Sequence, residues 1–281
     1  MVSVGTIIAI LVTLCVSVVL PIGVLIWYGV RNKGKGVWTA WLLGAAGFFV
    51  MQIIIRLPIL NILSLSPDFK LFAENNYVAY CLLLAFTAGL FEVVARYAVA
   101  KIMSKNLTFE RSIAAGLGHG GIEAILVIGM TYINNIVYVI LINTGAFDTV
   151  VAQAASTGAD VSALAGVKDA LINTGSGVFL LAGYERILTM ITHVAMTLLV
   201  CYFVSKKKSA AGVIICLAIH TVIDFISPVV SGMASDYLGN VITKGTAYAI
   251  IYTFLTAVAA GAIALIFVLK KKMEAGYDKE K

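Results

Sequence analysis

The sequence predicts an all-α fold: a polytopic bundle of about seven transmembrane helices that forms a single integral membrane domain of residues 1–281. Composition is the first reason, because 61% of the residues are hydrophobic and only 12% are charged, against about a quarter in a soluble domain. The second reason is a series of seven apolar stretches, each longer than the roughly 20 residues that a helix needs to cross the hydrocarbon. The third is that basic residues alternate between the connecting loops.

Seven spans are predicted in order along the chain. The first is not a cleaved signal sequence, because it is too long, has no basic residue before its apolar run and is followed by its charges. We expect residues 77–232 to form the core, since only the third to sixth spans carry two or more ionisable residues each. The predicted spans cover residues 3–30, 37–59, 77–103, 111–140, 176–205, 210–232 and 246–269.

The basic residues of the loops predict how the chain is oriented. Fourteen of them fall on the side that includes the C-terminus, whereas Lys70, Lys168 and Lys244 are the three on the opposite side. Because cytoplasmic loops carry the excess of Lys and Arg, we expect the N-terminus outside and the C-terminus in the cytoplasm of a bacterial plasma membrane. The net charge of +6 therefore fits a protein in contact with membrane lipid and does not indicate nucleic acid.

The second predicted outer loop, residues 141–175, is long enough to hold a helix of its own. Within it, Val161, Leu164, Val167 and Leu171 recur at helical spacing. We expect a short amphipathic helix there, lying on the outer surface or capping the bundle.

Ionisable residues gather at mid-membrane depth in four of the predicted spans. All three histidines of the chain lie inside spans. A rise of 1.5 Å per residue places six groups roughly 12–21 Å from the cytoplasmic ends of their helices. Ionisable residues at this depth are costly and mark functional sites, so we expect the six to converge. They are Glu92, His119, Glu123, His193, His220 and Asp224.

The segment Gly116–Glu123, read as GLGHGGIE, contributes two of these groups. His119 and Glu123 are four residues apart, which places both side chains on one face of a helix. Gly116 and Gly120 have the GxxxG spacing that lets two membrane helices approach closely. We therefore predict a close helix contact beside a polar site.

Two other spans repeat the four-residue spacing of charged groups, with Glu92–Arg96 and His220–Asp224. A carboxylate one turn from an arginine is held ionised and oriented, and one beside a histidine can fix the tautomer of its ring. The fifth span, which carries His193, adds two further candidate site residues, Glu185 and Arg186.

These residue types narrow the chemistry. The HExxH signature of common zinc proteases is absent, and Asp224 is the only aspartate within a span, so a pair of catalytic aspartates is excluded. A buried glutamate suits general-base work on water. Histidines either bind a metal or stabilise an oxyanion. Zinc is the candidate metal, with His119, His193 and His220 as its ligands if the reaction needs one; no other cofactor is indicated.

Three motifs between about Tyr77 and Pro228 resemble those of a known family. FEVVAR, ending at Arg96, resembles a first motif that is usually EExxxR; GLGHGGIE resembles an FxxxH or FxxxE element; and HTVID, starting at His220, resembles HxxxN or HxxxD. The sequence is thus similar to the YhfC family of glutamic-type intramembrane proteases. That family lies in the superfamily of CAAX-processing prenyl endopeptidases and PrsW-like proteases. Glu185, Arg186 and His193 fill the span between motifs as in YhfC-like sequences.

One position departs from the superfamily pattern. Phe91 occupies the place of the first of two adjacent glutamates, which is the water-activating base in the prenyl endopeptidases. Glu92 matches the second glutamate, the partner of the arginine. The base is therefore either Glu123 or Glu92 in a changed role.

The predicted function is an intramembrane endopeptidase that hydrolyses a peptide bond in or near the membrane, with a membrane-embedded or membrane-associated protein as substrate. A proton- or ion-coupled transporter would also use buried Glu, His and Asp. Against it, the chain shows no internal repeat and no paired broken helices. A non-catalytic membrane scaffold is the third alternative, although a scaffold hardly requires six clustered ionisable groups.

Overall fold

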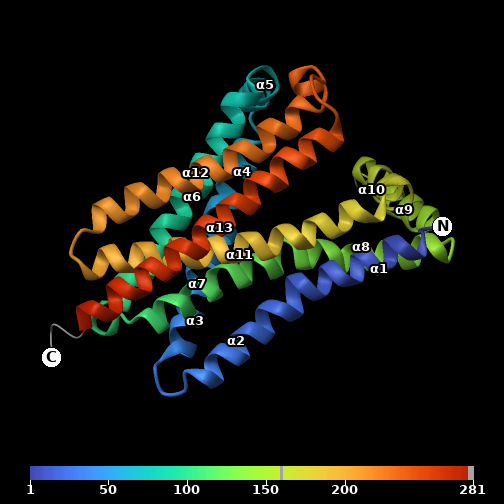
Figure 1. Cartoon of the computed structure of the whole chain (residues 1–281). Helices are drawn as coiled ribbons and strands as arrows, with labels where there is room; N and C mark the ends of the chain where they lie inside the picture. The colour runs from blue at the N-terminus through green and yellow to red at the C-terminus, as the bar shows by residue number, and fades with distance from the viewer. Residues whose placement is uncertain (159–160, 278–281) are drawn as a thin grey trace. The chain divides into compact units, whose positions relative to one another are not determined.

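The structure is a computed structural model and describes residues 1–158 and 161–277 (Figure 1). All regular secondary structure in these residues is helical. Seven helices among them are long and apolar enough to cross a membrane, which confirms the predicted fold class and number of spans. Which side of the membrane each terminus occupies stays a prediction. The spans are Val4–Arg31, Val37–Leu63, Tyr77–Ile102, Phe109–Asn143, Ser176–Ser205, Ser209–Met233 and Lys244–Ala275.

Three of the spans contain a π-helical segment, in which hydrogen bonds join residues five apart and which often occurs at functional sites. The first span comprises α1 (Val4–Leu14), η1 (Cys15–Val19) and α2 (Leu20–Arg31). The second comprises α3 (Val37–Phe48), η2 (Phe49–Arg56) and α4 (Leu57–Leu63). The fourth comprises α7 (Phe109–Glu123), η4 (Ala124–Gly129) and α8 (Met130–Asn143).

The other spans are single α-helices, and short helices occupy the loops. The long helices are α6 (Tyr77–Ile102), α11 (Ser176–Ser205), α12 (Ser209–Met233) and α13 (Lys244–Tyr277). The short ones are α5 (Pro67–Asn75), α9 (Phe147–Ser156), α10 (Ser162–Asn173) and the 3₁₀ turns Ser104–Asn106 and Asp236–Leu238. Proline at the first turn of α5 supports its start, because proline has no N–H to leave unsatisfied there.

The chain divides into two compact units. Unit 1 comprises Met1–Val24 and Glu123–Ile187, and unit 2 comprises Leu25–Ile122 and Leu188–Lys281. The single domain of residues 1–281 stays a prediction.

Unit 1 has its own apolar core, which includes the loop helices. Leu171 of α10 is buried there together with Ile10 of α1 and Phe147 of α9. Leu164 and Val167 pack against the same cluster. The predicted apolar stripe of residues 161–171 thus lies in α10 and contacts protein; its position relative to the membrane surface stays a prediction.

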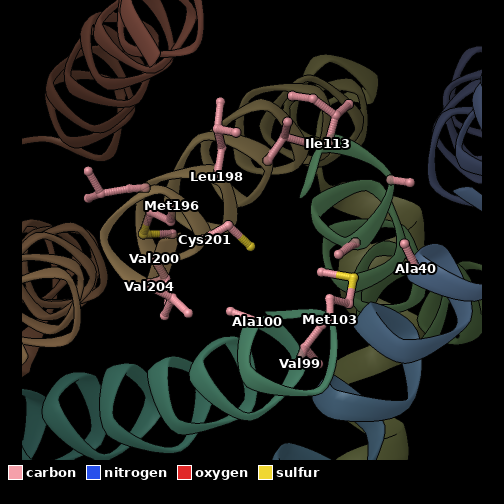
Figure 2. Packing of buried hydrophobic residues seen from close by; sticks show 14 of the residues in the cluster. Ala40, Val99, Ala100, Met103, Ile113, Met196, Leu198, Val200, Cys201 and Val204 are labelled. Carbon is pink, nitrogen blue, oxygen red and sulfur yellow. The ribbon is translucent and has the colours of Figure 1, made fainter. Parts of the chain in front are cut away.

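Unit 2 is built around α6, which packs along α12 and against α3. Its main apolar cluster joins residues from α3, α6, α7, α11 and α13 (Figure 2). Val99 and Ala100 of α6 face this cluster, as do Leu198 and Cys201 of α11. This packing fixes α6, α7 and α11, three of the helices that carry candidate site residues.

Glycines let α7 approach its neighbours in unit 2 unusually closely. A Cβ at Gly116 would lie 2.7 Å from the Cα of Val194, and one at Gly120 would lie 3.0 Å from the Cβ of His193. On another side of the helix, a Cβ at Gly118 would collide with the backbone carbonyl oxygen of Trp41. The close contact that the GxxxG spacing predicts is therefore confirmed, and it is made with α11.

Candidate functional site

Glu92 of α6 is the centre of the candidate site. It is only 4% exposed although it carries a carboxylate. A glycine leaves space beside it. If Gly89, one turn before Glu92, carried a Cβ atom, that atom would lie only 3.3 Å from the Cβ of His220. Glycine at this position therefore lets α12 bring its histidine close to the carboxylate.

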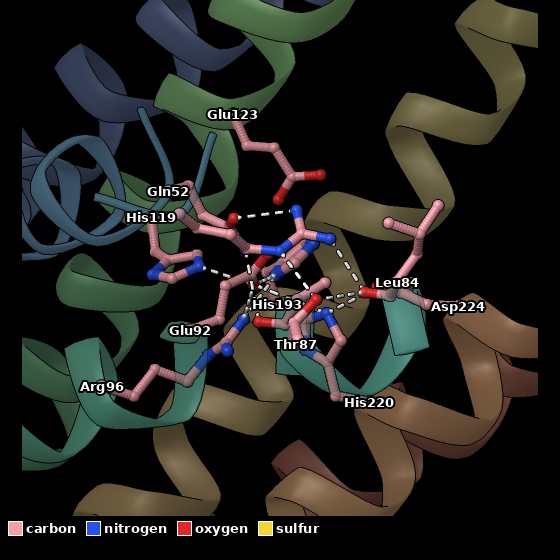
Figure 3. Close-up of polar contacts among 12 residues, drawn as sticks. Gln52, Leu84, Thr87, Glu92, Arg96, His119, Glu123, His193, His220 and Asp224 are labelled. Carbon is pink, nitrogen blue, oxygen red and sulfur yellow. Dashed lines mark hydrogen bonds and ion pairs between the residues drawn. The ribbon is translucent and has the colours of Figure 1, made fainter. Parts of the chain in front are cut away.

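Four nitrogen atoms surround one oxygen of Glu92 (Figure 3). Arg96 Nη2 and His119 Nε2 each lie 3.0 Å from Glu92 Oε2. His193 Nδ1 and His220 Nε2 each lie 3.6 Å from the same oxygen. Helices α6, α7, α11 and α12 thus meet at a single carboxylate oxygen.

The three histidine rings form a compact row beside this oxygen. The centroids of His119 and His193 are 5.3 Å apart with nearly parallel rings, and those of His193 and His220 are 5.8 Å apart. Each histidine is at most 6% exposed. Phe48 of α3 packs edge-on against His119 and closes the row at one end.

Arg96 links Glu92 to His193. Its Nη2 lies 2.6 Å from His193 Nδ1 as well as 3.0 Å from Glu92 Oε2. A guanidinium can only donate, so His193 Nδ1 accepts this hydrogen bond. Arg96 is 1% exposed, and its Nε and Nη1 have no hydrogen-bond partner among the described residues. The arginine therefore orients two site residues, and two of its nitrogen atoms remain able to donate further hydrogen bonds.

Asp224 extends the site toward more accessible surface. Its Oδ2 lies 3.0 Å from His220 Nε2, and 37% of its side chain is exposed, against 3% for His220. His220 Nδ1 is buried and has no hydrogen-bond partner in the described part of the chain. The His220–Asp224 pair predicted from spacing is therefore formed, with one ring nitrogen left to bind something else.

Gln52 is a site residue that the sequence analysis missed. It lies in η2, is 5% exposed, and its Nε2 donates to Glu92 Oε1 at 2.8 Å. Arg56, one turn further on, donates to Gln52 Oε1 at 3.2 Å. An uncharged amide in an apolar span, four residues before an arginine, was the signal that could have identified it.

The other three predicted residues form an ion trio in unit 1. Arg186 Nη1 lies 3.2 Å from Glu123 Oε1, and Arg186 Nη2 contacts Glu185 Oε1. Glu123 is also the last residue of α7, one turn after His119. Contacts thus link six of the nine predicted residues around Glu92, and contacts link Glu123, Glu185 and Arg186 to one another.

The residues around Glu92 fit a divalent cation in donor type and spacing. Glu92, His119 and His193 each offer a ligand atom, and these atoms lie within 4.8 Å of one another. Imidazole and carboxylate are donors that zinc prefers. His193 Nδ1 is, however, occupied by Arg96. A cation held by these three residues would replace the hydrogen bond between His119 and Glu92, and it would compete with Arg96 for His193 Nδ1.

Comparison with known proteins agrees with this geometry. Residues 16–261 match the family described as YhfC intramembrane metalloprotease. The chain belongs to this family. It is also 30% identical, over 198 residues, to the uncharacterized membrane protein YhfC of Bacillus subtilis (strain 168). That match covers 69% of this chain and 73% of the relative.

The family and the seven apolar helices establish an integral bacterial membrane protein. The family description is that of an intramembrane protease, and the glutamate–histidine cluster is compatible with a catalytic site. No solved structure matches the chain.

Proposed function

We propose that the protein is an intramembrane endopeptidase whose catalytic centre is Glu92 with His119, His193 and His220. The observation that carries this proposal is the single carboxylate oxygen of Glu92, which three histidines from three other helices approach within 3.6 Å. A structural ion pair would need only Arg96. Three additional groups that can each gain or lose a proton make the cluster suited to moving protons during hydrolysis.

Glu92 and His119 are positioned to activate water. The water oxygen attacks the carbonyl carbon of the scissile peptide bond, and Glu92 takes the proton that the water loses. His220, or His193, stabilises the negative charge that develops on the carbonyl oxygen. The C–N bond then breaks, and the proton held by Glu92 passes to the leaving amine. The products are a carboxylic acid and an amine, so one water is consumed for each bond cleaved.

The neighbouring charges orient these groups. Arg96 holds both Glu92 and His193 by hydrogen bonds from one nitrogen. Asp224 accepts from His220 Nε2 and fixes the orientation of that ring. The catalytic groups are therefore fixed before a substrate arrives, which lowers the cost of reaching the transition state.

A zinc ion, when bound, would supply Lewis acidity to the water or to the peptide carbonyl. Glu92, His119 and His193 are the residues that would hold it, and His193 Nδ1 would join them only by leaving Arg96. The metal requirement has its own measurement: zinc content per protein chain, compared between the wild type and His119→Ala. Cleavage that is lost on chelation and restored by zinc would indicate a metal, and cleavage that survives chelation would indicate the glutamate-and-water route.

Glu123 is the second candidate for the base. It lies one turn after His119 at the end of α7, which places it on the same helix face. Glu185 and Arg186 enter the proposal as the partners that hold Glu123 in its ionised form.

The function is tested with purified protein in proteoliposomes and quenched fluorescent peptides that each contain one apolar transmembrane segment. We expect the wild type to cleave at least one such peptide and Glu92→Gln to lose this cleavage. Glu74→Gln, the same change at an exposed residue of α5, is the matched control and should cleave normally. Full activity of both Glu92→Gln and Glu123→Gln would overturn the proposal, and loss of proton-coupled uptake in them would indicate a transporter.

A further inference from the structure

We propose that Gln52 and Arg56 are positioning residues that set the orientation of the Glu92 carboxylate. This inference rests on the proposed function of Glu92, and it concerns polar residues of the second span, all of whose contacts used here lie within unit 2.

Gln52 donates its amide hydrogen bonds to α6. Its Nε2 donates to Glu92 Oε1 at 2.8 Å and to the Ala88 carbonyl oxygen at 3.3 Å. This arrangement fixes Oε1 of Glu92 on the side of η2 (Figure 3). The other oxygen, Oε2, is then the one that faces Arg96 and the histidines. Gln52 thus fixes the plane of the carboxylate, so that one oxygen stays hydrogen-bonded to η2 and the other faces Arg96 and the histidines.

Arg56 decides which end of the Gln52 amide points at Glu92. A glutamine amide has two orientations of similar shape, one presenting NH₂ and the other presenting oxygen. Arg56 Nη1 lies 3.2 Å from Gln52 Oε1, and a guanidinium can only donate, so the oxygen must face Arg56. The NH₂ group is thereby turned toward the carboxylate.

Arg56 is itself anchored to the helix that carries Glu92. Its Nη2 donates to the Leu84 carbonyl oxygen at 2.8 Å, and its Nε donates to Thr87 Oγ1 at 3.2 Å. The chain of hydrogen bonds therefore starts on α6, passes through Arg56 and Gln52, and returns to α6 at Glu92. A closed chain of this kind resists rotation of every side chain in it.

The choice of a neutral donor favours positioning over charge balance. Arg96 already supplies a positive charge to Glu92 at 3.0 Å. Gln52 adds a hydrogen bond without adding charge, so it fixes the carboxylate and leaves the local charge unchanged. Partners of this kind typically account for about 10–100-fold in activity when they are removed.

The test compares Gln52→Leu, which keeps the volume and removes the donor, with Ser112→Ala. Ser112 is a buried polar residue of α7 that donates to the Thr108 carbonyl oxygen, so it controls for a lost buried hydrogen bond. We expect Gln52→Leu to lower kcat by about 10–100-fold, with KM unchanged within about twofold because no substrate contact is removed. Ser112→Ala should leave kcat unchanged.

Gln52→Glu separates positioning from a structural clamp between helices. This variant keeps the contact with Arg56, now as an ion pair, but places a carboxylate where Glu92 needs a donor. If Gln52 only holds two helices together, Gln52→Glu should keep its activity. If Gln52 positions Glu92, this variant should lose kcat to a similar extent as Gln52→Leu. Arg56→Met should lower kcat less, and should add no further loss in a Gln52→Leu background.

A second readout does not depend on cleavage. The infrared difference between the wild type and Glu92→Gln isolates the carboxylate band of Glu92. We expect Gln52→Leu to shift this band, because one hydrogen bond to Oε1 is lost, and Ser112→Ala to leave it in place. An unmoved band, or normal kcat in both Gln52 variants, would overturn the inference. Cleavage that survives in both Glu92→Gln and Glu123→Gln would instead overturn the proposed function, while the infrared band would still report on Gln52.

Discussion

The two clusters of buried charge differ in what their partners can do. In unit 2, the carboxylate of Glu92 is shared by one arginine, one glutamine and three histidines. In unit 1, Arg186 is held between Glu123 and Glu185. Histidine changes its charge near neutral pH, whereas arginine does not.

The two clusters are therefore suited to different roles, one to stability and the other to proton transfer. An ion trio with a permanently charged centre stabilises one arrangement, because losing either partner leaves a buried charge. A carboxylate surrounded by imidazoles can pass protons at low cost. Burial alone therefore does not identify a reaction centre; the protonation chemistry of the partners does.

The largest expected effect is at Glu92. We predict that Glu92→Gln lowers cleavage by about 10²–10⁴-fold, since a general base contributes this much, while the protein keeps its thermal unfolding temperature. His119→Ala should behave similarly. Steady-state cleavage of a transmembrane-segment peptide and a thermal melt in the same detergent measure both quantities. Equal losses of stability and activity would contradict a catalytic role for Glu92.

A substitution in the ion trio should show the reverse pattern. Arg186→Met leaves the carboxylates of Glu123 and Glu185 without their cation, and removing one partner of a buried ion pair costs about 3–5 kcal/mol of stability. We expect a clear fall in the thermal unfolding temperature. If kcat fell while the melt stayed unchanged, Arg186 would belong with the catalytic groups.

The packing of α7 should show a smaller effect. Gly118→Ala forces a methyl group against the Trp41 carbonyl oxygen, and such overpacking typically costs about 1–3 kcal/mol. Gly261→Ala, in the interior of α13 with open space beside it, is the matched control and should be neutral or slightly stabilising. Thermal melts of the two variants give the comparison, and equal melts would mean that the α7 contact is not tight.

The smallest expected effect is at Asp224, which lies at the exposed edge of the unit 2 cluster. Asp224→Asn keeps the shape and a hydrogen-bond acceptor for His220 but removes the charge. We predict a loss of about tenfold in kcat, below the range for a general base. A loss as large as that of Glu92→Gln would place Asp224 among the groups that move protons.

Much of the fold and of the site could be predicted from the sequence. Long apolar runs predict spans reliably because a membrane leaves few other ways to satisfy the backbone. The four-residue spacings at Glu92–Arg96 and His220–Asp224 correctly predict contacts, since they depend only on helix geometry.

Contacts between helices could not be predicted in the same way. Spacing places Arg186 and His193 on one face, but it does not say which partner each meets; Arg96 contacts His193, and Arg186 contacts Glu123. Gln52 was not predicted as a site residue, because it carries no charge. The π-helical turn in which it lies also has no recognisable sequence pattern. Loop helices such as α5 were also missed, since short helices depend on local capping and packing.

The glycine contacts of α7 limit how the protein can move. Only hydrogen atoms separate Gly118 from the carbonyl of Trp41 and Gly116 from the backbone of Val194. Sliding α7 by one residue would bring larger side chains against these backbones, so α7 has no alternative register. A buried site admits substrate only when some helix moves, typically within microseconds to milliseconds. Under the proposed function, that movement would leave α7 in register with α3 and α11, so that His119 keeps a fixed position.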